Sequence, residues 1–143
     1  MIRRQFEGSR LSQQIKVSVK ELVDAAYGEI ETLGVADAIP LAGSDGVVLV
    51  DIRDIRELKR DGRVPGAFHC PRGMLEFWID PGSPYFKPVF GEDKKFVFFC
   101  AGGQRSALAA QTAQRMGLKP VAHIREGFSG WKKSGGPVEL DPK

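Results

Sequence analysis

Two uninterrupted apolar runs constrain the fold of this chain most strongly. Residues 47–50 are all apolar and are followed by Asp51, and residues 96–99 are all apolar and are followed by Cys100. Continuous apolar runs of this length are typical of strands that are buried on both faces. Such strands occur in parallel sheets that helices cover on both sides. The two runs therefore predict two central strands of a parallel sheet, one ending at a carboxylate and the other at a thiol.

The rest of the chain contains patterns that are typical of helices and of shorter strands. Ser18 and Glu21 have the spacing of a capping box, and the apolar residues after them indicate a first helix. A short apolar segment lies at residues 30–33, and short strands are expected near residues 67–70 and 121–124. Helices are expected over residues 35–41, 54–60, 106–116 and 128–133, with a short helix and an irregular loop in residues 71–93. Strands that alternate with helices predict an α/β domain with a mostly parallel sheet.

Length, charge and leader signals limit the classes of function. The 143 residues fit one domain, and we predict a mobile polar segment over residues 1–14 followed by a single domain over residues 15–143. The net charge of +3 comes from basic residues that are interleaved with acidic ones, which argues against a nucleic-acid surface. No apolar stretch has the length of a signal peptide or a membrane span, so we expect a cytoplasmic protein with no membrane partner.

The segment from Cys100 to Ser106 carries the chemistry. It follows a buried strand and precedes a helix, and sites in open α/β sheets form at the carboxyl ends of strands. Gly102 and Gly103 allow a tight turn whose N–H groups, together with those of the helix, can surround an anion. A cysteine at the centre of such a nest ionises more easily, and Arg105 adds a permanent positive charge.

A thiolate that faces a bound anion supports two reactions. It can attack the outer sulfur of a thiosulfonate-like donor, which gives a cysteine persulfide and releases sulfite, or it can attack a phosphoryl group. The alternative is that Cys100 is a buried structural cysteine, since free cysteines are often buried. The combination of strand end, glycine-rich turn, helix start and arginine favours the functional interpretation.

At these residues the chain resembles the rhodanese family. Residues 100–105 read Cys-Ala-Gly-Gly-Gln-Arg, which is similar to that family's Cys-x-x-Gly-x-Arg active-site loop. Three other segments resemble family signatures in the same order, although Arg63 stands in place of the usual histidine and Glu126 in place of a glycine. These segments are residues 49–53, residues 62–67, and residues 126–131 with the later Gly-Pro at 136–137.

The resemblance implies an open five-stranded parallel sheet flanked by helices on both faces, with persulfide chemistry on Cys100. It also implies that the backbone of the loop holds the transferred sulfur or the substrate anion. The residues that would do so are Ala101, Gly102, Gly103, Gln104, Arg105 and Ser106. The loop from Cys100 to Arg105 has six residues, which in this family accompanies sulfur transfer, whereas a seventh is typical of the phosphatase and arsenate-reductase relatives.

The expected function is therefore transfer of sulfane sulfur from thiosulfate or a similar small anionic donor to cyanide, a small thiol or a protein thiol. No cofactor is expected. A phosphatase or arsenate reductase on the same scaffold is one alternative, and a non-enzymatic persulfide carrier or regulatory module is another. We expect no metal site, because no group of His, Cys and Asp residues has ligand spacing.

Four residues outside the loop are expected to support the site. Asp51 would orient Arg53 or brace the active-site loop, and Arg63 and Arg72 would line the mouth of the pocket and attract anions. Cys70 is interpreted as a packed residue, with a role as a resolving thiol for Cys100 as the alternative. The two histidines, at positions 69 and 123, are expected to be structural.

Overall fold

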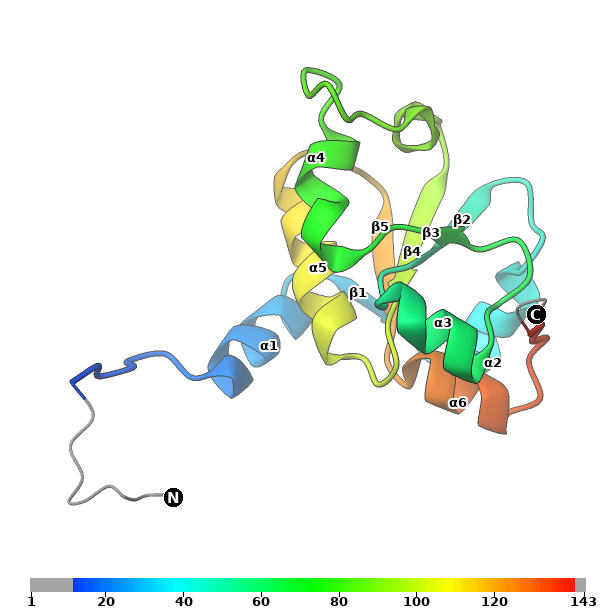
Figure 1. Cartoon of the computed structure of the whole chain (residues 1–143), viewed down its shortest axis with the longest axis horizontal. Coiled ribbons are helices and arrows are strands. Elements are labelled where there is room, and N and C mark those ends of the chain that lie inside the picture. The colour runs from blue at the N-terminus through cyan, green and yellow to red at the C-terminus, as the bar shows by residue number, and fades with distance from the viewer. Residues whose placement is uncertain (1–11, 141–143) are drawn as a thin grey trace.

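The computed structural model of the chain describes residues 12–140, which form one five-stranded sheet between two layers of helices (Figure 1). The strand order is β1-β5-β4-β2-β3, and every neighbouring pair is parallel. The predicted open parallel sheet is thus confirmed. The strands are β1 Glu31–Leu33, β2 Val47–Asp51, β3 Phe68–His69, β4 Lys95–Phe99 and β5 Val121–Ile124.

The two apolar runs are the adjacent central strands β2 and β4, which pair along their whole length. Side chains of a strand alternate between the two faces of the sheet. Accordingly, Phe96 and Phe98 belong to the core on one face, while Val97 and Phe99 belong to the core on the other. Because both faces are covered, Leu49 and Val50 of β2 and all of residues 96–99 of β4 are buried, while residues 47–48 are partly buried. Burial on both faces explains the absence of a polar alternation in the sequence.

Helices α1, α4 and α5 cover one face of the sheet, and helices α2, α3 and α6 lie on the other side (Figure 1). The bounds are α1 Val19–Tyr27, α2 Val35–Ala38, α3 Ile55–Asp61, α4 Leu75–Ile79, α5 Gln104–Arg115 and α6 Gly127–Lys133, with 3-10 turns at Ile39–Leu41, Arg72–Met74 and Pro88–Gly91. The predicted capping box of α1 is present, since Ser18 and Glu21 each accept a hydrogen bond from the other's main-chain N–H.

Helix α5 begins two residues earlier than its apolar pattern predicts. The pattern starts at Ser106, whereas the helix starts at Gln104, directly after Gly103 in a left-handed conformation. The first turn carries Gln104 and Arg105, whose side chains are exposed and contribute nothing to a buried stripe. Burial periodicity therefore could not reveal this turn, although its N–H groups are the ones that lie nearest to the loop.

Residues 1–11 and 141–143 lie outside the described residues. They include most of the segment predicted to be mobile, so the division into a mobile segment and a single domain stays a prediction. Residues 12–18 precede α1 without helix or strand. Within residues 12–140, the helices are too short or too polar to cross a bilayer.

A buried ion pair joins three elements at the carboxyl edge of the sheet. Asp51 ends β2, and its carboxylate accepts hydrogen bonds from the Arg53 guanidinium at 2.7–3.2 Å. Arg53 also donates to the carbonyl of Gly62, directly after α3, at 2.9 Å, and lies 4.0 Å above the Phe128 ring of α6. Both charged side chains are only 1% exposed. The expectation that Asp51 orients Arg53 agrees with this geometry.

We predict that Asp51→Asn lowers the free energy of unfolding by about 3 kcal/mol, because it leaves a buried guanidinium without its counter-charge. Denaturant unfolding followed by circular dichroism measures the loss. Asp24→Asn is the control, since Asp24 pairs with Lys20 on the exposed face of α1, where solvent screens the pair and a much smaller loss is expected. Equal losses in the two variants would contradict the role assigned to the buried pair.

Candidate active site

The sulfur of Cys100 lies between the end of β4 and the start of α5. The residue is 1% exposed, and its Sγ accepts hydrogen bonds from the main-chain N–H groups of Gly103 at 3.2 Å and Ser106 at 3.4 Å. The N-terminus of α5, with its unpaired N–H groups and positive dipole end, therefore faces the sulfur. The sequence predicted donors from residues 101–105; of these, the N–H of Gly103 contacts the sulfur, and the second donor, Ser106, follows that segment.

Donors outside the loop fix the orientation of its peptide groups. The carbonyls of Cys100 and Ala101 accept hydrogen bonds from the N–H groups of Phe128 and Ser129, in the first turn of α6, at 2.7 and 3.1 Å. The carbonyl of Gly103 accepts one from the Tyr27 hydroxyl at 3.2 Å. Because these carbonyls are held from outside, the loop is not free to rotate its peptides away from the sulfur.

Glycine is required at two places where the loop touches its neighbours. Gly103 has φ +96°, and a Cβ there would lie 2.1 Å from the carbonyl oxygen of Arg125. Gly127 has φ +64°, and a Cβ there would lie 2.6 Å from the carbonyl oxygen of Cys100. Both positions combine a left-handed backbone with a close approach, so no other residue fits without moving the loop.

Arg105 is held by a carboxylate from another helix. Its two terminal nitrogens donate to Glu57 Oε1 at 2.8 Å and Oε2 at 3.0 Å. Glu57 also accepts from the N–H of Asp54 and so completes the capping box of α3. The bond with Arg105 lowers the pKa of the Glu57 carboxyl and raises that of the guanidinium. Sequence reasoning missed Glu57 as a site residue, because its partner is 48 residues away.

A pocket of about 290 Å³ opens over the sulfur and is lined by Cys100, Gly102, Gln104 and Arg105. Three of the six residues predicted to bind substrate therefore line it. Gly103 and Ser106 lie behind the sulfur and direct their N–H groups at it.

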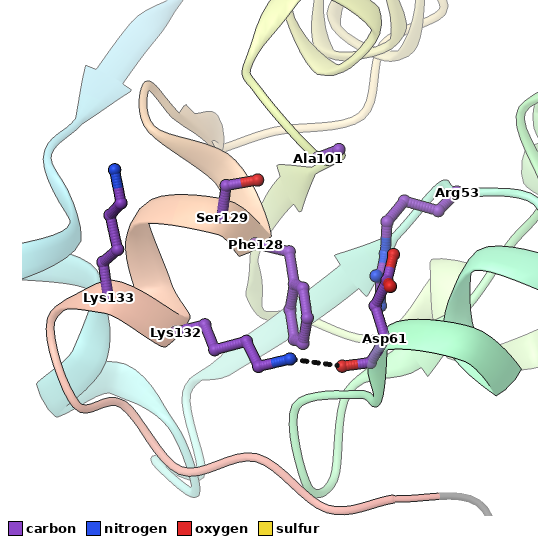
Figure 2. Close-up of a pocket in the computed structure, with 7 residues that line it drawn as sticks. All are labelled: Arg53, Asp61, Ala101, Phe128, Ser129, Lys132 and Lys133. Atoms are coloured by element: carbon purple, nitrogen blue, oxygen red, sulfur yellow. Dashed lines mark hydrogen bonds between the residues drawn. The ribbon is translucent and has the colours of Figure 1, made fainter.

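Ala101, the remaining predicted residue, borders a second pocket of about 400 Å³ (Figure 2). In Figure 2 the Phe128 ring stands between the Lys132 side chain of α6 and Arg53, and Lys132 Nζ donates to the main-chain carbonyl of Asp61 at 3.1 Å. The loop thus separates two hollows, and the sulfur belongs to the smaller one.

The two histidines make hydrogen bonds within the frame of the site. His123 is fully buried, with Nδ1 3.1 Å from Ser106 Oγ and Nε2 3.0 Å from Thr32 Oγ1. Burial lowers the pKa of His123 to about 4, so its ring is neutral near pH 7. His69 Nε2 lies 2.7 Å from the carbonyl of Arg53. Both geometries suit the structural roles expected for these residues.

The structure does not bring Arg63 and Arg72 into the lining of the sulfur pocket. The main chain of Arg63 pairs with that of Glu139, and the Arg72 guanidinium pairs with Glu76 at 2.9 Å. Cys70 is fully buried, and burial raises the pKa of its thiol to about 12, which disfavours a role as a resolving thiolate. Within residues 12–140, no group of three or more His, Cys, Asp or Glu residues could hold a metal ion.

Comparison with protein families and curated proteins gives one consistent result. Residues 35–134 match the family described as the rhodanese-like domain. Thiosulfate sulfurtransferase GlpE from Glaesserella parasuis is 30% identical over 97 residues, which are 68% of this chain and 82% of that protein. Thiosulfate sulfurtransferase/rhodanese-like domain-containing protein 3 from Mus musculus is 27% identical over 64% of this chain, and the match spans only 61% of the mouse protein.

Solved structures show the same fold. A protein of unknown function from Rhodopseudomonas palustris, described as a possible tyrosine phosphatase, is 63% identical with a TM-score of 0.88, over 91% of this chain and all of that one. The polysulfide-sulfur transferase homodimer from Wolinella succinogenes is 28% identical with a TM-score of 0.65, over 85% of this chain and 87% of that one.

We predict that Gly103→Ala destabilises the protein by about 2 kcal/mol or more, because alanine is strained at a positive φ and its Cβ would collide with the Arg125 carbonyl. Thermal unfolding of Gly103→Ala and of a control variant at the neighbouring glycine measures the loss of stability. Gly102→Ala is the matched control, since a Cβ at Gly102 meets no atom within 4 Å and is expected to change stability by about 0.5 kcal/mol at most. If Gly103→Ala were as stable as Gly102→Ala, the required close approach would be wrong.

Proposed function

The chain belongs to the rhodanese family, and on this basis we propose that it is a sulfurtransferase that carries sulfane sulfur as a persulfide on Cys100. The observation that carries the proposal is the pair of main-chain N–H groups, from Gly103 and Ser106, that donate to the buried Sγ at the N-terminus of α5. These donors and the positive end of the α5 dipole are directed at the atom that carries negative charge when it attacks the donor and when the acceptor releases it.

In the first half-reaction, the Cys100 thiolate attacks the outer sulfur of thiosulfate or a similar donor. A new S–S bond forms to Cys100, the S–S bond of the donor breaks, and its electron pair leaves with sulfite. The outer sulfur then occupies the pocket beside Gly102, Gln104 and Arg105. The Arg105 guanidinium and the free N–H groups of the loop would hold the donor's anionic end.

In the second half-reaction, an acceptor such as cyanide, a small thiol or a protein thiol attacks the terminal sulfur of the persulfide. The bond to Cys100 Sγ breaks, and the thiolate is restored for the next cycle. Because the donor product leaves before the acceptor reacts, ping-pong kinetics are expected. All of this chemistry uses one sulfur atom and a set of hydrogen-bond donors, so no cofactor is invoked.

A phosphatase is the second candidate, because the Rhodopseudomonas palustris protein is described as a possible one. Two features favour sulfur transfer over phosphate-ester hydrolysis. The loop from Cys100 to Arg105 has six residues, which the family associates with sulfur transfer. In addition, expulsion of an alkoxide or phenoxide from a phosphate ester benefits from a general acid, whereas Glu57, the carboxyl paired to the pocket arginine, is held ionised by Arg105. Sulfite needs no such proton when it leaves.

A persulfide carrier or regulatory module would share the first half-reaction but not rapid turnover. Repeated thiocyanate formation from thiosulfate and cyanide distinguishes an enzyme from a carrier that is loaded once. The cytoplasmic location and the absence of nucleic-acid and membrane partners stay predictions.

We predict that Cys100→Ser lowers the rate of thiocyanate formation by at least about 1,000-fold, because serine cannot form a persulfide. Cys70→Ala, which removes the other thiol, is expected to retain most of the activity. An aryl phosphate should be hydrolysed far more slowly than thiosulfate is consumed. Turnover of thiosulfate by Cys100→Ser at a rate near that of the wild type would defeat the proposal, and faster phosphate hydrolysis would favour the phosphatase.

A further inference from the structure

We propose that the Glu57 carboxylate selects among sulfur donors by their charge, and favours singly charged donors such as organic thiosulfonates relative to dianions such as thiosulfate. This inference rests on the proposed sulfur transfer at Cys100 and deepens it by naming the substrate class. Glu57 would act through Arg105 and through the field of its own carboxylate, as a specificity residue that does not react.

The positive charge of Arg105 is largely compensated by the carboxylate of Glu57. Among the described residues that line the sulfur pocket, Arg105 is the only one with a permanent charge. Glu57 takes one hydrogen from each of its terminal nitrogens, at 2.8 and 3.0 Å, in the strongest form of arginine–carboxylate contact. The guanidinium keeps other N–H groups for a ligand, but the paired Glu57 carboxylate opposes its charge.

The Glu57–Arg105 ion pair is part of the framework of the protein rather than a chance surface contact. Glu57 is 18% exposed, against 45% for Arg105, so the carboxylate is the more buried partner. The same carboxylate accepts the N–H of Asp54 at the start of α3, which fixes it from the other side. Since the pKa of Glu57 is lowered by Arg105, the carboxylate stays ionised throughout the neutral range.

The charge balance then disfavours a dianion. The Cys100 thiolate that must attack is itself negative, and the Glu57 carboxylate offsets the cation that would otherwise draw a second negative group into the pocket. The energy of a donor in the field of a fixed charge is proportional to the donor's own charge. Removal of the Glu57 charge should therefore help a doubly charged donor about twice as much, in free energy, as a singly charged one.

Two donors that differ by one charge make the test direct. Thiosulfate, a dianion, gives its outer sulfur to Cys100 and leaves as sulfite; methanethiosulfonate, a monoanion, gives the equivalent sulfur and leaves as methanesulfinate. In both cases one S–S bond forms to Cys100 and one S–S bond of the donor breaks, so the chemistry is matched. We would measure kcat/KM for each donor with cyanide as the acceptor, at low ionic strength where charge effects are largest.

Glu57→Gln is the informative variant, because glutamine keeps an oxygen that can cap α3 and accept from Arg105. We expect kcat/KM to rise about threefold for methanethiosulfonate and about tenfold for thiosulfate, since the gain for the dianion is the square of that for the monoanion. Glu29→Gln is the matched control. Glu29 pairs with Arg115 at the C-terminal end of α5, the helix that begins next to the sulfur, and the variant has the same net charge as Glu57→Gln. It should leave the ratio of the two kcat/KM values unchanged.

An equal change for both donors in Glu57→Gln would overturn the inference, because it would show that Glu57 only positions Arg105. A shift of the ratio toward the monoanion would overturn it as well. Glu57→Ala, checked for folding by circular dichroism, must shift the ratio in the same direction as Glu57→Gln. If the wild type transfers sulfur from neither donor, the proposed function itself is wrong, and that outcome is distinct from an unchanged ratio in an active enzyme.

Discussion

The hydrogen bonds from the first turn of α6 to the carbonyls of Cys100 and Ala101 are the constraint on which the site depends. They fix two peptide groups of a short loop that would otherwise have several conformations available. Gly103, in its left-handed conformation against the Arg125 carbonyl, then turns the chain into α5. With the loop fixed in this way, the N–H groups of Gly103 and Ser106 converge on the sulfur.

Two arginine–carboxylate pairs organise the same edge of the sheet at different depths. The Asp51–Arg53 pair is buried and links β2, the end of α3 and α6, so it belongs to the framework. The Glu57–Arg105 pair is partly exposed and links α3 to the first turn of α5, where it borders the sulfur pocket. Helix α3 lies between the two pairs: Glu57 in its first turn holds Arg105, and the carbonyl of Gly62, directly after its last residue, accepts a hydrogen bond from Arg53.

Much of the fold and the centre of the site could be predicted from the sequence because they depend on local patterns. The apolar runs before Asp51 and Cys100 identified the central strands, and the order of strand, glycine-rich turn and helix located the loop. The rest depends on contacts between distant residues. Tyr27 bonds to Gly103 across 76 positions and Glu57 to Arg105 across 48, and neither sequence neighbourhood indicates its partner. Arg63 and Arg72 have the charge expected at a pocket mouth, but the main-chain bridge to Glu139 and the pair with Glu76 hold them elsewhere.

The central claim is that Cys100 takes up one sulfur atom from an anionic donor, and the intact mass of the protein tests it most directly. After treatment with thiosulfate and removal of excess donor, the wild type is predicted to gain about 32 Da, the mass of one sulfur atom, and to lose it again on addition of cyanide. The Cys100→Ser variant, treated in the same way, is predicted to keep its original mass. An unchanged mass in the wild type, or an equal gain in both proteins, would contradict the account.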